Sequence, residues 1–247
     1  RAAATPYRVP GAAELPARLP PVLTVLYLIF NEGYAATSGP LLRTDLCLEA
    51  VRLARALAEL MPDEPEVLGL LALLLLSEAR RPARVGPGGE LVTLAEQDRS
   101  LWNRELIAEG HELVRRCLRR NRPGPYQLQA AINAVHTDGA AAERTQVLAL
   151  YDQLLAQTPT PIVALNRAVA VAEVHGPAAA LAAIEGLELP GYHLLPATRA
   201  DLLARLGRSP EARAAYDAAI ALTGNHTERA FLEGRRAGLE PQSSSQP

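Results

Sequence analysis

Apolar residues recur along most of the chain at intervals of three and four, the spacing that places them on one face of a helix. Runs of β-branched or aromatic residues are scarce, so the pattern favours helix over sheet. We predict an all-α protein with no sheet larger than a short hairpin near residues 85–93. The predicted helices cover residues 21–34, 45–60, 65–79, 100–120, 125–136, 143–157, 161–175, 177–185, 194–206, 210–222 and 227–236.

Proline-containing turns separate many of these helices. Four such turns begin at Pro62, Pro123, Pro159 and Pro190. Proline ends one helix and fits the first turn of the next, so each turn marks a boundary between helices. The last two intervals, of 36 and 31 residues, lie near the period of tetratricopeptide repeats, which is about 34 residues.

A direct self-alignment supports the repeat. Residues 165–174 align with residues 197–206 at an offset of 32 residues, and each segment then reaches a glycine turn. In the second unit, Ala212 and Tyr216 occupy positions at which neighbouring units pack, so both are predicted to be buried. The sequence therefore predicts a tetratricopeptide-like helical-repeat superhelix.

The domain organisation follows from these boundaries. Residues 14–122 are predicted to form an N-terminal helical block with one tetratricopeptide-like pair, interrupted by a Gly- and Pro-rich loop insertion at residues 80–97. Residues 123–236 are predicted to form the later repeats. Residues 237–247 have the composition of a disordered tail.

Composition and charge limit the functions that the chain can have. Hydrophobic residues make up 49% of it, which is enough for a core, and the formal net charge is −2. All 25 basic residues are arginines, but no overall attraction to nucleic acid is expected, so we predict no direct DNA binding. The most apolar run, residues 67–76, is too short to span a membrane. Cys47 and Cys117 are predicted to be buried thiols in a cytoplasmic protein.

No catalytic motif is found in the sequence. It contains no phosphate-binding loop, no nucleophile elbow and no dinucleotide fingerprint. The five histidines have no metal-ligand spacing. We therefore expect no enzymatic activity, no cofactor and no metal site, and we favour a protein-interaction domain.

Two regions stand out as candidate sites: the turn at residues 31–34 and the insertion with the residues that follow it to Trp102. Loops as long as the insertion are often functional, although Trp102 can simply anchor this one. We expect the insertion to fold onto the N-terminal helices, with its arginines paired to Glu32, Glu78 and Asp98. The candidate interaction or pocket residues are Asn31, Glu32, Tyr34, Arg80, Arg81, Arg84, Gln97, Asp98, Arg99, Trp102, Asn166 and Arg167.

If the repeat register holds, a further set of side chains points to the concave face of the superhelix. This set is Glu66, Gln127, Asn166, Thr198 and Arg205.

Seven segments together carry a resemblance to a known group of proteins. They are residues 26–34 (LYLIFNEGY), 61–76 (MPDEPEVLGLLALLLL), 79–84 (ARRPAR), 97–102 (QDRSLW), 124–131 (GPYQLQAA), 164–173 (ALNRAVAVAE) and 191–203 (GYHLLPATRADLL). In this order they resemble the C-terminal extension of extracytoplasmic-function RNA polymerase sigma factors that end in a tetratricopeptide-like domain. Residues 5–10 (TPYRVP) resemble the link after the promoter-binding helix-turn-helix.

The resemblance implies that residues 1–13 are a linker from an upstream sigma region. It also implies that the full protein directs RNA polymerase to promoters and that this part controls that activity. The implied partners are the upstream sigma domains, RNA polymerase or a regulatory protein.

Two other functions stay open at this stage. One is a small-molecule sensor, whose pocket would be lined by Arg80, Arg81, Arg84 and Trp102 between the N-terminal helices and the insertion. The other is a stand-alone tetratricopeptide scaffold. Pairing of these arginines with acidic residues in a solid core would oppose the sensor.

Overall fold

The computed structural model describes residues 11, 14–138 and 143–239. Apart from residue 11, the predicted linker at residues 1–13 lies outside the described residues, as does the predicted tail from residue 240 onward. Over the described residues the chain is all-α, as predicted, and forms eleven α-helices. Their bounds are α1 Leu15–Tyr34, α2 Thr44–Leu60, α3 Pro65–Glu78, α4 Arg104–Arg120, α5 Pro125–Asp138, α6 Glu143–Gln157, α7 Pro161–His175, α8 Pro177–Ala183, α9 Leu194–Arg205, α10 Ser209–Leu222 and α11 His226–Ala237.

Every predicted helix is present, and two of them begin several residues away from the predicted position. α1 begins at Leu15 and continues through Pro20 and Pro21. Its first turns are exposed, so backbone carbonyls that lose a donor to proline remain open to water. α4 begins at Arg104, because the side chain of Asn103 accepts hydrogen bonds from two backbone N–H groups of the first turn, each at 3.0 Å.

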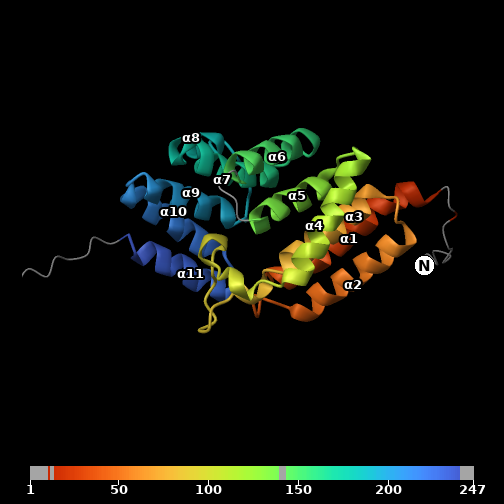
Figure 1. Cartoon of the computed structure of the whole chain (residues 1–247). Helices are drawn as coiled ribbons and strands as arrows, with labels where there is room; N and C mark the ends of the chain where they lie inside the picture. The colour runs from red at the N-terminus through yellow and green to blue at the C-terminus, as the bar shows by residue number, and fades with distance from the viewer. Residues whose placement is uncertain (1–10, 12–13, 139–142, 240–247) are drawn as a thin grey trace, which may run out of the picture.

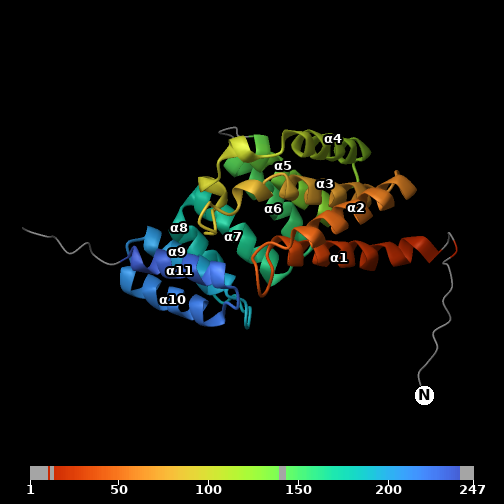
Figure 2. The same ribbon diagram turned by 90° about the horizontal axis from the view of Figure 1, so that it is seen from below.

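The helices stack in chain order into a curved array (Figure 1). α1 to α4 form one end of the array and α8 to α11 the other, while α5, α6 and α7 lie between them (Figures 1 and 2). Neighbouring helices in the sequence pack against each other along most of the chain. This arrangement is the nearest-neighbour stacking that defines a helical-repeat protein.

The core is divided into three clusters along the array. The first surrounds α3 and the last joins α9, α10 and α11. α5 contributes to two clusters, because Ala130 and Ala134 face the first while Leu128 and Ile132 face the second. α5 thus belongs to the cores of both the N-terminal block and the later repeats, and the side chain of Asn225 also joins them by donating to the backbone oxygens of Ala36 and Gly39.

α3 is the most buried helix of the array. All of its residues except Glu66 are buried, and α1, α2, α4 and α5 pack around it. This packing explains the apolar run at residues 67–76 as core. Among the described helices, none is long and apolar enough to cross a membrane.

Gly69 permits the close approach of α3 to α5. A Cβ atom added there would lie 2.7 Å from the backbone nitrogen of Gln127. We expect Gly69→Ala to lower the free energy of unfolding by about 1–3 kcal/mol, because the two backbones must separate. Urea denaturation checks this value. The control is Gly234→Ala in exposed α11, where a Cβ meets nothing within 4 Å, and which should be neutral or stabilising.

The repeat register predicted from the sequence is confirmed in the C-terminal half. Gly176 and Gly207 turn the chain with φ of 85° and 73°, a left-handed conformation that favours glycine. The Arg205 guanidinium donates to Glu173 at 2.9 Å, so residues one 32-residue offset apart join neighbouring repeats. Ala212 and Tyr216 are buried, as predicted.

The insertion is a compact loop. It holds two 3₁₀ turns, η2 (Arg81–Ala83) and η3 (Leu94–Glu96), and a third, η4 (Arg99–Leu101), follows it before α4. An isolated antiparallel bridge joins Val85 to Leu91. This bridge agrees with the expectation of nothing larger than a short hairpin.

Candidate functional site

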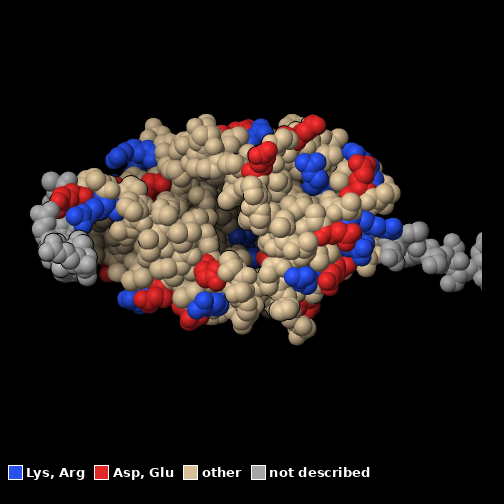
Figure 3. Space-filling model, turned by 180° about the vertical axis from the view of Figure 1, so that it is seen from behind, with Lys and Arg blue, Asp and Glu red and all other residues tan. Residues whose placement is uncertain are grey.

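A cavity of about 430 Å³ lies between α1, α3, α5, α6 and α7, and we call it the central cavity. It mixes apolar walls with amide, hydroxyl and phenol groups. Figure 3 shows the back of the molecule, where a hollow near the middle has basic atoms at its floor. The lining residues are Tyr27, Phe30, Asn31, Tyr34, Leu73, Ser77, Arg80, Gln129, Ile132, Asn133, Tyr151, Leu154, Thr158, Thr160, Ile162, Val163 and Asn166.

Of the described residues that line the central cavity, Arg80 alone is charged. Its side chain is buried, and its Nε donates to the backbone oxygen of Leu76 at 3.3 Å. Its Nη2 donates to the side-chain oxygen of Asn133. No carboxylate among the described residues forms an ion pair with Arg80. Burial lowers the pKa of the Arg80 guanidinium, because a low-dielectric site disfavours its charge.

Tyrosines supply the other polar groups of the cavity. The Tyr27 hydroxyl donates to the side-chain oxygen of Gln129 at 3.1 Å, which joins α1 to α5. Burial raises the pKa of Tyr151 to about 12, so this phenol is neutral at physiological pH. The central cavity therefore contains one buried cation among neutral hydrogen-bonding groups.

The other arginines of the insertion find partners near the N-terminal helices. Arg81 pairs with Glu78 at 2.6 Å. The Arg84 guanidinium lies 4.1 Å from the centre of the Tyr34 ring, an attractive cation–π geometry. Arg99 lies 5.1 Å from the centre of the Trp102 ring. The insertion thus folds onto the N-terminal helices.

Of the three acidic partners predicted for these arginines, only Glu78 is confirmed. The predictions for Glu32 and Asp98 are wrong. Glu32 accepts from the backbone and hydroxyl of Thr37, and Asp98 accepts from the backbone N–H of Ser100 at 2.8 Å. Aromatic rings took the place of carboxylates, since a ring face also attracts a guanidinium.

The remaining predicted residues divide between the central cavity and other positions. Asn31, Tyr34 and Asn166 line the cavity with Arg80. Arg167 instead pairs with Asp152 at 2.6 Å. The side-chain oxygen of Gln97 is buried without a hydrogen-bond partner among the described residues. Of the four residues expected to line a sensor pocket, only Arg80 does so here, because Arg81, Arg84 and Trp102 have their own partners.

The five residues predicted to share the concave face (Glu66, Gln127, Asn166, Thr198 and Arg205) lie in different places in the structure. The Glu66 carboxylate accepts from the backbone N–H groups of Tyr126 and Gln127, at 3.1 and 3.2 Å. It therefore caps the start of α5, where a negative charge is favoured, and the prediction that Glu66 and Gln127 face a binding surface is wrong. Thr198 and Arg205 lie in a groove beside the insertion.

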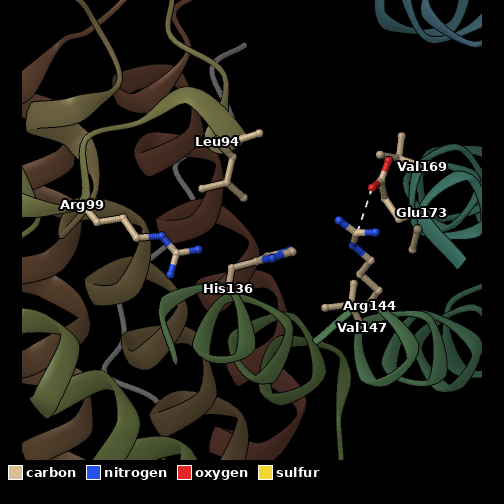
Figure 4. Close-up of a pocket in the computed structure, with 9 residues that line it drawn as sticks. Leu94, Arg99, His136, Arg144, Val147, Val169 and Glu173 are labelled. Atoms are coloured by element: carbon tan, nitrogen blue, oxygen red, sulfur yellow. Dashed lines mark ion pairs between the residues drawn. The ribbon is translucent and has the colours of Figure 1, made fainter. Parts of the chain in front are cut away.

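This groove, which we call the insertion groove, runs between η3 and the later repeats. Two adjoining hollows of about 440 and 590 Å³ form it, and both are lined by Leu94, Ala95, Val169 and Glu173. Figure 4 shows Leu94 and Arg99 on one side and the ion pair of Arg144 with Glu173, at 3.9 Å, on the other. The groove is mostly apolar, with charges at its edge.

His136 points into the insertion groove from α5 (Figure 4). Burial, helped by the positive charges of Arg80 and Arg99, lowers its pKa from 6.5 to about 4. The folded protein therefore holds a neutral imidazole at pH 7. Because the folded pKa is below the unfolded value, this contribution to stability is complete above about pH 6.5 and is lost as the pH falls toward 4.

We expect the wild type to lose about 3 kcal/mol more unfolding free energy than His136→Gln between pH 7 and pH 4. The glutamine is neutral throughout, so carboxylate titration affects both proteins alike. Chemical denaturation at several pH values measures the difference. Parallel pH profiles for the two proteins would contradict the assignment of a depressed pKa to His136.

The cysteines behave as predicted. Both thiols are buried, and burial raises the pKa of Cys47 to about 12 and of Cys117 to about 11. They are therefore thiols rather than reactive thiolates at physiological pH. Among the described residues, no group of three or more His, Cys, Asp or Glu side chains could hold a metal ion.

Five arginines form a basic cluster at the end of α4 (Arg115, Arg116, Arg119, Arg120 and Arg122), and three of them pair with carboxylates. Arg115 and Arg119 both pair with Glu112, at 3.0 and 3.1 Å, and Arg120 pairs with Asp63 at 2.7 Å.

DNA binding needs several free cations that release counterions. We therefore expect no duplex DNA binding by this chain at physiological salt. A fluorescence anisotropy titration that gave submicromolar, salt-sensitive binding, lost when these arginines become Gln, would disprove this prediction.

Sequence analysis missed several residues of these two sites. Gln129, Asn133 and Tyr151 line the central cavity, and His136 lines the insertion groove. Gln129 lies within one of the segments that carry the resemblance, which is a signal that could have identified it. Asn133 and Tyr151 give no such signal, because they meet only where α1, α5 and α6 line the same cavity.

The fold defines a class, the tetratricopeptide-like helical proteins. The structure is similar to that of a thermophilic TPR protein from Thermus thermophilus, with a TM-score of 0.55 over 92% of this chain and 98% of that chain. The two sequences are 18% identical, so the likeness shows the fold alone.

The comparisons at sequence level are more specific. Residues 18–118, which include α2, α3 and most of α1 and α4, match a family described as a family of unknown function (DUF6596). An uncharacterized protein of Rhizobium meliloti (strain 1021) is 47% identical over 237 residues, or 94% of this chain. This chain spans 56% of that relative's length.

Proposed function

We propose that this chain is a regulatory interaction domain of an RNA polymerase sigma factor. In this proposal it controls the activity of upstream sigma domains that bind polymerase and promoter DNA. It acts through contacts on a rigid helical-repeat scaffold rather than through catalysis. Such a protein would work in the cytoplasm, where RNA polymerase is found.

One observation carries the proposal. Five of the seven segments that resemble the sigma-factor extension contribute side chains to the central cavity. Tyr34, Leu73, Arg80, Gln129 and Asn166 each come from a different one of these segments. Segments far apart in the sequence therefore meet at one place, as expected if the resemblance reflects a shared working part rather than scattered helical propensity.

A surface for contact with another domain lies on α1. Val22, Val25 and Leu28 are exposed by 45, 55 and 59%, and they form an apolar strip because residues three apart share a helix face. Exposed apolar patches are typical of interaction sites. The segment that resembles the link to the promoter-binding domain directly precedes α1 in the sequence. We assign this strip to contact with the upstream sigma domains.

The test is promoter-dependent transcription by the natural full-length protein with core RNA polymerase. We expect Val25→Glu with Leu28→Glu to change initiation severalfold, because carboxylates on the strip oppose an apolar contact. The matched control is Leu118→Glu on α4, whose side chain is 69% exposed, because α4 packs on α3 and α5 rather than being part of the α1 strip. Circular dichroism checks that both variants fold.

The two outcomes separate clearly. Altered transcription by the α1 variant alone supports control through this surface. Equal transcription by the wild type, the α1 variant and the α4 variant would contradict the assignment of the strip to the upstream domains.

A further inference from the structure

We propose that the central cavity binds a small organic acid whose carboxylate pairs with Arg80. This inference goes beyond the regulatory role, because binding by the chain alone does not depend on any contact with polymerase.

Within the described part of the chain, Arg80 is a buried cation without an anion. Its side chain donates to two neutral oxygens, those of Leu76 and Asn133. Burial raises the pKa of nearby Tyr151 to about 12, so its phenol supplies no negative charge to Arg80 at pH 7. A buried charge is strongly unfavourable unless an opposite charge and hydrogen bonds compensate it. A bound carboxylate would supply the missing compensation.

The neighbouring arginines, Arg81 and Arg84, are less buried than Arg80 and have other partners. Arg81 has the Glu78 carboxylate, and Arg84 has the ring of Tyr34. Both lie near Arg80 in the sequence, and the positive charge of Arg84 makes the site of Arg80 still less favourable for a cation. Arg80 alone lines the central cavity among the described arginines, so the uncompensated charge faces space that a ligand can enter.

The charge of Arg80 and the apolar walls of the central cavity define the class of ligand. A single guanidinium balances one negative charge, which fits a monocarboxylate better than a doubly charged phosphate. His136, across α5, adds no second charge near pH 7, because its pKa is about 4. Phe30, Leu73 and Ile132 give the cavity apolar walls, so the rest of the ligand is aromatic or aliphatic. The volume of about 430 Å³ lies within the range of small-molecule sites.

The direct test is calorimetric titration of the 247-residue chain with four acids: acetate, benzoate, 3-phenylpropionate and octanoate. The uncharged amide of each acid is the matched ligand control. We expect at least one acid with an apolar body to bind about tenfold or more tightly than its amide, because a charge-assisted hydrogen bond to the guanidinium is lost. Acetate should bind weakest, since it lacks the apolar part.

Arg80→Met and Arg104→Met provide the protein controls. Methionine removes the charge but keeps an unbranched apolar chain, so Arg80→Met should abolish the preference for acid over amide. Its melting temperature without ligand should equal or exceed that of the wild type, because the uncompensated charge is gone. Arg104 is exposed at the start of α4, so Arg104→Met should bind the acids as the wild type does.

Three results would overturn the proposal. The first is equal binding of acid and amide, and the second is no binding of any of the four acids at about 10 mM, the weak limit of specific recognition. The third is a melting temperature of Arg80→Met far below that of the wild type, which would make Arg80 a structural residue. None of these results bears on transcription, so failure here is distinguishable from failure of the regulatory role.

Discussion

Replacing Tyr216 by alanine is expected to lower the free energy of unfolding by about 3–5 kcal/mol, the usual cost of removing a large aromatic side chain from a core. Tyr216 is 2% exposed and lies in the third core cluster, which joins α9, α10 and α11. Its hydroxyl also interacts with the guanidinium of Arg235. The side chain therefore holds the last repeat against α11, and alanine would leave a cavity between them.

Urea denaturation monitored by circular dichroism measures this loss. The control is Leu222→Ala, a change in the same helix at a side chain that is 46% exposed, and it should cost less than about 1 kcal/mol. Similar midpoints for Tyr216→Ala and the wild type would show that the register of the last repeat is wrong.

Replacing Trp102 by alanine is expected to cost a similar amount, about 3–5 kcal/mol. Trp102 is 5% exposed, and the Arg99 guanidinium lies over its ring. The backbone N–H of the next residue, Asn103, donates to the backbone oxygen of Ala79 at 2.9 Å. Both ends of the insertion thus meet beside this ring, so its removal should loosen the whole loop.

Hydrogen exchange locates the effect of that change. In Trp102→Ala, amides of residues 80–102 should exchange faster than in the wild type, while those of the α9–α11 core keep their protection. Leu101→Ala, at a side chain that is 53% exposed, should leave both regions unchanged. Unaltered exchange in the insertion of Trp102→Ala would show that other contacts hold the loop.

Most of the fold could be predicted from the sequence because local rules agree with each other. Prolines mark the starts of α3, α5, α7 and α8, and the 32-residue offset correctly places Ala212 and Tyr216 in the core. The start of α1 was missed because Pro20 and Pro21 read as a helix start, although they lie inside the helix. The free-energy cost of a proline inside a helix depends on whether the backbone carbonyls that lose a hydrogen-bond donor are open to water. The sequence alone does not show this exposure.

The site was harder to predict than the fold. Sequence identified Arg80, Asn31, Tyr34 and Asn166 one by one, but it grouped Arg80 with Arg81 and Arg84 because they are close in the chain. The structure groups Arg80 instead with residues of α1, α5, α6 and α7. Arg81 pairs with Glu78, three residues away, but which of these arginines faces the cavity depends on the packing of distant helices rather than on local pattern.

The central claim, that this chain belongs to the control of transcription initiation, is tested most directly by mixing the natural full-length protein with core RNA polymerase. The measurements are complex formation by size-exclusion chromatography and run-off transcription from promoters selected by that mixture out of genomic DNA. The account predicts a stable complex and promoter-specific transcripts that core polymerase alone does not make. Absence of both the complex and the transcripts, with the helical domain folded, would contradict it.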